Sequence, residues 1–208
     1  MTQDSKGREV IPSEFPRITL NELLPGDAIL FIGGNKLTEF HGKYRRKEFG
    51  RSDTPPYHEA MVYVVSQGID PIVMILDPVA LTSFQDLNKY MKHKESRIDI
   101  IRYNLTDEQR KICQEAAEVM TSKVRIYDTK GYGAFISQMP LLGWVKHIIK
   151  PSETKFYCSD GVTYCIQDRA GYIVSPRDHN FTAPVDSQVY AINNPDRAQL
   201  RTLKLRGE

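Results

Sequence analysis

The sequence contains few cysteines and no long apolar run. Only three of its 208 residues are cysteine, at positions 113, 158 and 165. Such an odd and sparse set argues against the disulfide framework that holds many small secreted domains together. No stretch approaches the roughly 18 consecutive apolar residues that a membrane-spanning helix needs. We therefore expect neither a structural disulfide nor a membrane span.

A strong excess of charge of one sign is also missing. The chain has 28 Lys and Arg against 26 Asp and Glu, a net charge of +2. This balance does not favour nucleic acid or an anionic membrane as the main partner. The opening stretch MTQDSKGREVIPSEFP lacks the apolar segment of a secretory signal. We expect a cytoplasmic protein without a nucleic-acid partner, although delivery by another system stays open.

Metal and phosphate motifs are absent as well. Cys158 and Cys165 are seven positions apart, and no histidine or further cysteine lies near them at zinc-ligand spacing. The glycines of FIGGN form a turn signal without the GxxxxGK pattern of a phosphate-binding loop. The sequence therefore predicts no metal site and no cofactor.

What is present fits one globular domain with a single core. Hydrophobic residues make up 40% of the chain and charged residues 26%. We expect a flexible polar arm over residues 1–17, a folded domain over 18–193 and a polar tail over 194–208. Residues 35–56 are polar and basic, and they are predicted to form a long loop before the next strand.

Hydrophobic periodicity predicts an α+β fold in which an antiparallel sheet, or a half-barrel, packs against helices. The expected strands cover residues 28–32, 57–66, 72–80, 97–104 and 185–193. The expected helices cover 83–93, 105–123, 132–149 with a break at Pro140, and the segment from Cys158 to Gly171. Thr106 and Gln109 form a capping box for the second of these helices, and Cys113 is interpreted as a small buried residue.

Cys158 is the first candidate for chemistry. In KFYCSDGVTYC it stands directly before an expected helix start. The positive end of a helix dipole lowers the pKa of a thiol and favours the thiolate, which attacks carbonyl carbon. The alternatives are half of a disulfide, a metal ligand or a small core residue. Cys165, two helical turns later, is interpreted as core.

His58 is the best candidate for the base among five histidines, the others being His41, His93, His147 and His179. It begins a strand whose same-face neighbours are small or apolar, and a strand-borne imidazole facing a helix N-terminus is the papain-like arrangement. A structural histidine is the alternative. Asp77 is the only carboxylate on the strand that returns from His58. It either orients the imidazole or merely begins the following turn.

Substrate contacts are harder to place. Tyr157 and Tyr127 are either walls of the active site or core aromatics. The basic run of Lys43, Arg45, Arg46, Lys47 and Arg51 leads toward His58. Arg45 and Arg46 either select an anionic substrate by long-range attraction or lie on a solvated surface loop.

Several motifs occur together in the order found in one enzyme family. They are LLPGDAILFIGG, YHEAMVYV, MILDPVA, LTDEQRKICQEAAEVM, VRIYDTKGY, KFYCSDGVTYC and IVSPRDHNFTAPVDSQVYAI. From about residue 19 to 192 the chain resembles the permuted NlpC/P60 proteins, which are papain-like thiol hydrolases in which the histidine strand precedes the cysteine helix. It is most similar to their YiiX/YaeF-like branch and more distantly to lecithin:retinol acyltransferase-like enzymes.

The resemblance implies a cysteine peptidase or amidase with a Cys158–His58–Asp77 triad. Asp77 stands where the family usually has Glu or another polar residue, and the 35–56 segment is longer than in many relatives. The implied substrate is a peptide, a cell-wall fragment or a lipid ester. Two alternatives remain: a lipid acyltransferase or hydrolase of the same fold, and a catalytically idle binding or structural module.

Overall fold

The computed structural model describes residues 2–3, 9–10, 15–33, 56–78, 82–91, 97–122, 158–175 and 182–203. These residues form an α+β fold built around a seven-stranded sheet with the order β3-β9-β8-β4-β5-β6-β7. The strands are β3 (Arg17–Ile18), β4 (Ala28–Ile32), β5 (Pro56–Ser66), β6 (Ile72–Pro78), β7 (Thr82–Asp86), β8 (Arg97–Tyr103) and β9 (Ala198–Leu203). A separate two-stranded pair consists of β1 (Thr2–Gln3) and β2 (Glu9–Val10).

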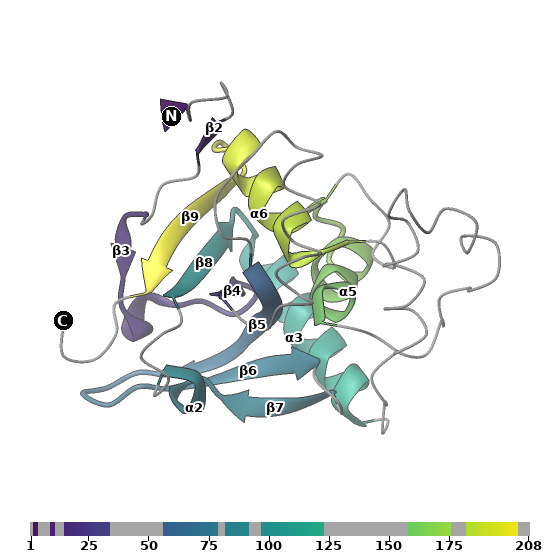
Figure 1. The fold of residues 1–208 in the computed structure, drawn as a ribbon. Helices are drawn as coiled ribbons and strands as arrows, with labels where there is room; N and C mark the ends of the chain where they lie inside the picture. The colour runs from purple at the N-terminus through teal and green to yellow at the C-terminus, as the bar shows by residue number, and fades with distance from the viewer. Residues whose placement is uncertain are drawn as a thin grey trace.

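The longer helices pack together on one face of the sheet (Figure 1). The helical segments are η1 (Leu20–Glu22), α2 (Asn88–Met91), α3 (Asp107–Ser122), α5 (Cys158–Thr163), the π-helical continuation η3 (Tyr164–Arg169) and α6 (Pro184–Asn193). One apolar cluster joins this face to α3, α5 and η3, and a second cluster covers the other face with residues such as Ile18, Leu23 and Leu87. The central strand β4 is buried along its whole length because both of its faces are covered.

Strand β5 carries alternating side chains until a bulge interrupts the alternation. Ala60 and Val62 belong to the second cluster, whereas Met61 belongs to the cluster beneath the helices. The register with β6 shifts between Val62 and Val64. As a result Val65 packs with the second cluster and Val64 is exposed, so the alternation of the two faces is interrupted after Val62.

The capping box at the start of α3 is confirmed. The Thr106 N–H donates to Gln109 Oε1 at 3.0 Å, and the Gln109 N–H donates to Thr106 Oγ1 at 3.2 Å. Cys113 is fully buried in this helix, as expected. Helical spacing places Val119 with the apolar residues Ile112, Ala116 and Met120, but in the structure Val119 is 44% exposed and Ala117 is buried.

One expected element is wrong and another is right only in part. Residues 185–193 form helix α6 and not a strand, because Pro184 begins a helical turn and Asp186 accepts a hydrogen bond from the Ala183 N–H at 2.8 Å. The helix expected over 83–93 is present only as α2 at Asn88–Met91, because residues 83–86 belong to strand β7, which pairs with β6 from Pro78↔Thr82 to Met74↔Asp86. Pairing with a strand edge outweighs the weak helical periodicity of this segment.

The sheet is mixed and extends further along the chain than expected. Strand β9 pairs antiparallel with β8 and parallel with β3, so a purely antiparallel sheet was a wrong prediction. Residues 198–203 fall within the polar tail that the sequence predicts for 194–208, yet Ala198, Thr202 and Leu203 are buried. The helix expected over 132–149, and all of the 35–56 loop except Pro56, lie outside the described residues. Among the described helices, none has the length and apolar character to cross a membrane.

Candidate active site

Three sequence elements bring Cys158, His58 and Asp77 together. His58 lies near the start of β5, and Asp77 lies near the end of the neighbouring antiparallel strand β6. His58 Nε2 is 2.8 Å from Asp77 Oδ1. Helix α5, which begins at Cys158, contacts both strands. The interpretation of Asp77 as the carboxylate that orients His58 therefore agrees with the geometry.

Cys158 is held at the ring of His58. Its side chain is only 8% exposed, and it interacts with His58 by a hydrogen bond. Because His58 Nε2 faces Asp77, the other ring nitrogen, Nδ1, is left for the sulfur. Burial acts to raise the pKa of the Cys158 thiol, but His58 and the backbone N–H groups of Glu59 and Ser159 together lower it below its ordinary value.

The pKa of His58 moves in the opposite direction. Burial acts to lower it, whereas hydrogen bonds to Asp77 and Cys158 and the negative charges of both groups raise it to about 10. A lowered thiol pKa beside a raised imidazole pKa describes a thiolate–imidazolium pair. Such a pair supplies both the nucleophile and the acid that an acyl-transfer reaction requires.

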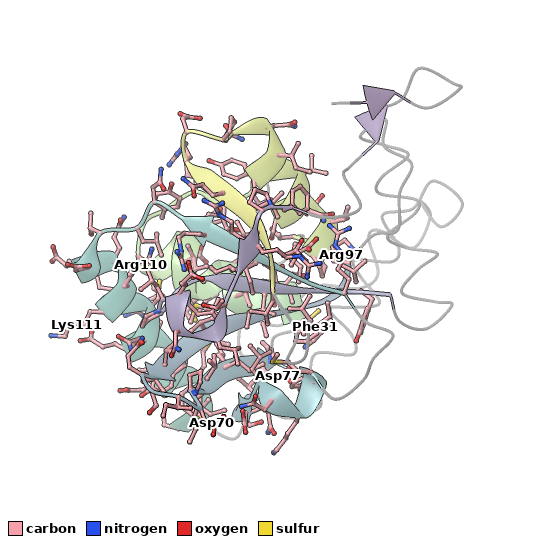
Figure 2. All side chains as sticks on the ribbon, turned by 90° about the vertical axis from the view of Figure 1, so that its left-hand side faces the viewer. Phe31, Asp70, Asp77, Arg97, Arg110 and Lys111 are labelled. Carbon is pink, nitrogen blue, oxygen red and sulfur yellow. The ribbon has the colours of Figure 1, made fainter. Side chains whose placement is uncertain are left out.

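Aromatic side chains surround the His58–Asp77 pair. Phe31 lies opposite His58 in the β4–β5 register, and its ring stacks on the imidazole with centroids 5.3 Å apart. The Tyr90 ring lies 4.9 Å from that of Phe31, and the Tyr90 hydroxyl donates a hydrogen bond to Asp77 Oδ2. Figure 2 labels Phe31 and Asp77, which come from β4 and β6. Neither Phe31 nor Tyr90 was expected from the sequence, since only the fold brings them to His58.

A buried acidic residue lies directly behind the pair. Glu59 is fully buried on the face of β5 opposite to His58, and its Oε2 accepts a hydrogen bond from Ser187 of α6 at 3.2 Å. Its Oε1 has no hydrogen-bond partner within the part of the chain that the structure describes. Burial first, and the Cys158 charge second, raise the pKa of Glu59 well above its usual range. The motif YHEAMVYV gave one signal of this residue, a carboxylate within an apolar strand.

The other predicted residues divide into two groups. Cys113 and Cys165 are fully buried, which confirms their interpretation as core residues, and all three cysteines are free thiols rather than disulfide partners. The predicted substrate residues Tyr157, Tyr127, Arg45 and Arg46 lie outside the described residues, as do His41, His93, His147 and His179. The choice of His58 therefore rests on its own contacts.

The described residues contain no group of three or more His, Cys, Asp or Glu side chains that could hold a metal ion. No protein-family model and no curated protein matches the chain. The geometry of Cys158, His58 and Asp77 therefore carries the argument for function.

Proposed function

We propose that this protein is a papain-like cysteine hydrolase of the permuted NlpC/P60 type, which cleaves an amide or ester bond. The observation that carries the proposal is the continuous set of interactions from Asp77 through His58 to Cys158. The order of the residues also supports it, because the histidine strand and the carboxylate strand both precede the helix that the cysteine begins.

In the first step, the Cys158 thiolate attacks the carbonyl carbon of the substrate, and a sulfur–carbon bond forms. The carbonyl oxygen becomes negative, and we assign its stabilisation to the backbone N–H of Cys158 at the start of α5. The imidazolium of His58 then protonates the leaving nitrogen or oxygen as its bond to carbon breaks. The product of this step is a thioester on Cys158, with His58 neutral.

In the second step, His58 takes a proton from water as the water oxygen attacks the thioester. The carbon–sulfur bond breaks, the acid product leaves and the thiolate–imidazolium pair is restored. Asp77 remains hydrogen-bonded to Nε2 throughout and keeps Nδ1 directed toward the sulfur. The resemblance to permuted NlpC/P60 proteins favours peptides, cell-wall fragments or lipid esters as the substrate class.

The experiment is a comparison of two cysteine variants of the full chain. Peptide amides, peptidoglycan fragments and lipid esters are each incubated with the protein, and intact mass reports an acyl adduct before turnover. Cys158→Ala should abolish both adduct and hydrolysis. Cys165→Ala should keep both and cost about 1 kcal/mol of unfolding free energy, because it leaves a small cavity beside Met120. Exchange of the two phenotypes would overturn the assignment of the nucleophile.

A further inference from the structure

The Asp77 carboxylate is buried and, among the described residues, has a hydrogen-bond partner at each of its two oxygens. Its side chain is 2% exposed. Oδ1 faces His58 Nε2 at 2.8 Å, and Oδ2 accepts from the Tyr90 hydroxyl. A carboxylate in such a position depends on donors from the protein, because water does not reach it. Tyr90 supplies one of these two donors.

The position of Tyr90 is itself fixed by the strands that carry the site. Leu87, just before α2, is fully buried, and its N–H donates to the Val73 carbonyl of β6 at 2.9 Å. The Tyr90 N–H donates to the Leu87 carbonyl at 3.0 Å, which forms the turn that places the Tyr90 ring. Helix α2 lies beside β6 and β7 (Figure 1). The hydroxyl of Tyr90 is therefore held at Asp77 by the same sheet edge that holds Asp77.

Tyr90 also contacts the aromatic ring that stacks on the imidazole of His58. Its ring packs against Phe31 at 4.9 Å, and Phe31 in turn stacks on His58. Tyr90 thus acts on His58 through two contacts, the carboxylate on one side and the Phe31 ring on the other. Packing of the Tyr90 ring does not require its hydroxyl to face the carboxylate. Removal of the hydroxyl alone therefore separates a role in packing from a role at Asp77.

We propose that Tyr90 is a positioning residue that sets the reactivity of Cys158 through Asp77 and His58. This inference rests on the proposed function, because it assumes that the Cys158–His58 pair is the reacting centre. Tyr90 does not touch the sulfur. Its hydroxyl fixes the plane of the Asp77 carboxylate, which fixes the imidazole and stabilises its protonated form beside the thiolate.

The test uses iodoacetamide, which alkylates the thiolate and requires no knowledge of the substrate. The rate of alkylation of Cys158 is measured from pH 4 to 10 by peptide mass spectrometry on the full chain. In Tyr90→Phe the aromatic ring remains and only the hydroxyl is lost. We expect the apparent pKa of Cys158 to rise by about one unit, so that the rate in the acid range falls about tenfold.

Tyr63→Phe is the matched control. The Tyr63 hydroxyl also donates to a carboxylate, that of Glu118 on α3, at 2.5 Å, and Tyr63 lies at the bulge of β5, five residues after His58. Its loss removes the same kind of hydrogen bond without touching the site, so the pH profile of Cys158 should stay unchanged. Asp77→Asn should shift the profile at least as far as Tyr90→Phe, and the double variant should shift no further than Asp77→Asn.

The outcomes separate the two proposals. A Tyr90→Phe profile equal to that of the wild type, with Asp77→Asn shifted, overturns the role of Tyr90 and leaves the triad intact. A wild-type Cys158 that titrates as an ordinary thiol overturns the triad and Tyr90 together. If Tyr90→Phe fails to fold, NMR of the wild type decides. A slowly exchanging Tyr90 hydroxyl proton that is lost in Asp77→Asn supports the proposal, and its absence overturns it.

Discussion

At the residue scale, four ionisable side chains share a small buried volume at the junction of β5, β6 and α5. Asp77, His58 and Cys158 form one interacting chain, and Glu59 lies behind it within range of both the Cys158 and the His58 charges. Two negative charges, on Asp77 and the thiolate, are offset by one positive charge on His58. For Glu59, burial first and the Cys158 charge second outweigh the Ser187 hydrogen bond and the attraction of His58, and the pKa of the carboxyl is therefore raised.

The thiolate–imidazolium pair predicts a specific dependence of stability on pH. When folded, the pair keeps one proton from the lowered pKa of Cys158 up to about 10, the pKa of His58. In the unfolded chain, His58 and Cys158 together bind two protons below pH 6.5, one between pH 6.5 and 9.0, and none above pH 9.0. The unfolded thiol loses its proton near pH 9.0, whereas the folded imidazolium keeps its proton to about 10, so the stability contributed by the pair should fall between these two pH values.

Urea denaturation between pH 5 and 10 measures this contribution. The reference is the Cys158→Ala/His58→Gln double variant, which lacks both titrating groups. The difference in unfolding free energy between wild type and reference should be level just below pH 9 and smaller at pH 10. A difference that decreases steadily from pH 6.5 upward would mean that His58 titrates alone and that no ion pair forms with Cys158.

Glu59 leads to a prediction of the opposite kind, because burial raises its pKa when the chain folds. An acid whose pKa is raised in the folded state binds more protons when folded than when unfolded, so its contribution destabilises the fold as pH rises above 4.5. Glu59→Gln keeps the shape and the acceptor for Ser187 but removes the ionisation. The unfolding free energy of Glu59→Gln minus that of the wild type should therefore be larger at pH 7 than at pH 4.

Thermal melts at pH 4 and pH 7 check this expectation. Glu118→Gln, at an exposed carboxylate on α3, is the control and should show little difference between the two pH values. If Glu59→Gln lowers stability equally at both pH values, the carboxylate is an ordinary hydrogen-bonding group and its burial carries no ionisation penalty.

At the element scale, the close approach of α5 to β6 and α3 sets the position of the nucleophile. A Cβ at Gly161 would lie 2.9 Å from Pro78 Cγ and 3.1 Å from Met120 Cε. Pro78 follows Asp77 directly, and Gly161 lies one helical turn after Cys158. Only a glycine lets the first turn of α5 pack this closely against the strand that carries Asp77.

Gly161→Ala should therefore destabilise the protein, although the same substitution in an unhindered helix stabilises by about 1 kcal/mol. The added methyl group should displace α5 from β6 and separate Cys158 from His58, which slows alkylation of Cys158 at acid pH. Denaturant titration and the iodoacetamide profile check the two effects. A more stable variant with an unchanged profile would show that α5 has space against Pro78.

The elements that could be predicted from sequence are those whose local signals agree with their tertiary setting. Strand β5 follows a clear alternation, and α3 has its Thr106–Gln109 capping box, so both were found. Helix α6 was missed because VDSQVYAIN is buried on nearly all sides and has no clear polar face. Strand β7 was missed because the sequence of its five residues does not indicate that they pair with β6.

At the scale of the whole molecule, the candidate site depends on contacts between residues far apart in the chain. His58 and Asp77 were predictable together because one hairpin joins their strands. Cys158 was predictable from its position before a helix, but its distance from His58 was not. The links from Ser187 to Glu59 and from Tyr90 to Asp77 were beyond prediction, since nothing local to Ser187 or Tyr90 indicates which strand each side chain will meet.

The last strand shows how the whole sheet supports this site. Strand β9 pairs with β8 and β3, and the Thr202 hydroxyl donates to the buried Asp99 of β8 at 2.9 Å. Asp99 also accepts hydrogen bonds from Arg97. Strand β8 is the neighbour of β4, which carries Phe31 to the ring of His58. Residues 198–203 are thus connected to His58 through three adjacent strands.

A chain that ends at Asn193 should consequently fail to fold, because β8 loses one of its two neighbouring strands and the buried Asp99 loses the Thr202 hydroxyl. A chain that ends at Leu203 keeps all of β9 and should fold as the full protein does. Circular dichroism and the cooperativity of urea unfolding compare the two truncations. If the chain ending at Asn193 unfolds cooperatively and retains acid-range alkylation of Cys158, then β9 only covers the sheet edge, and residues up to 193 are sufficient for the fold.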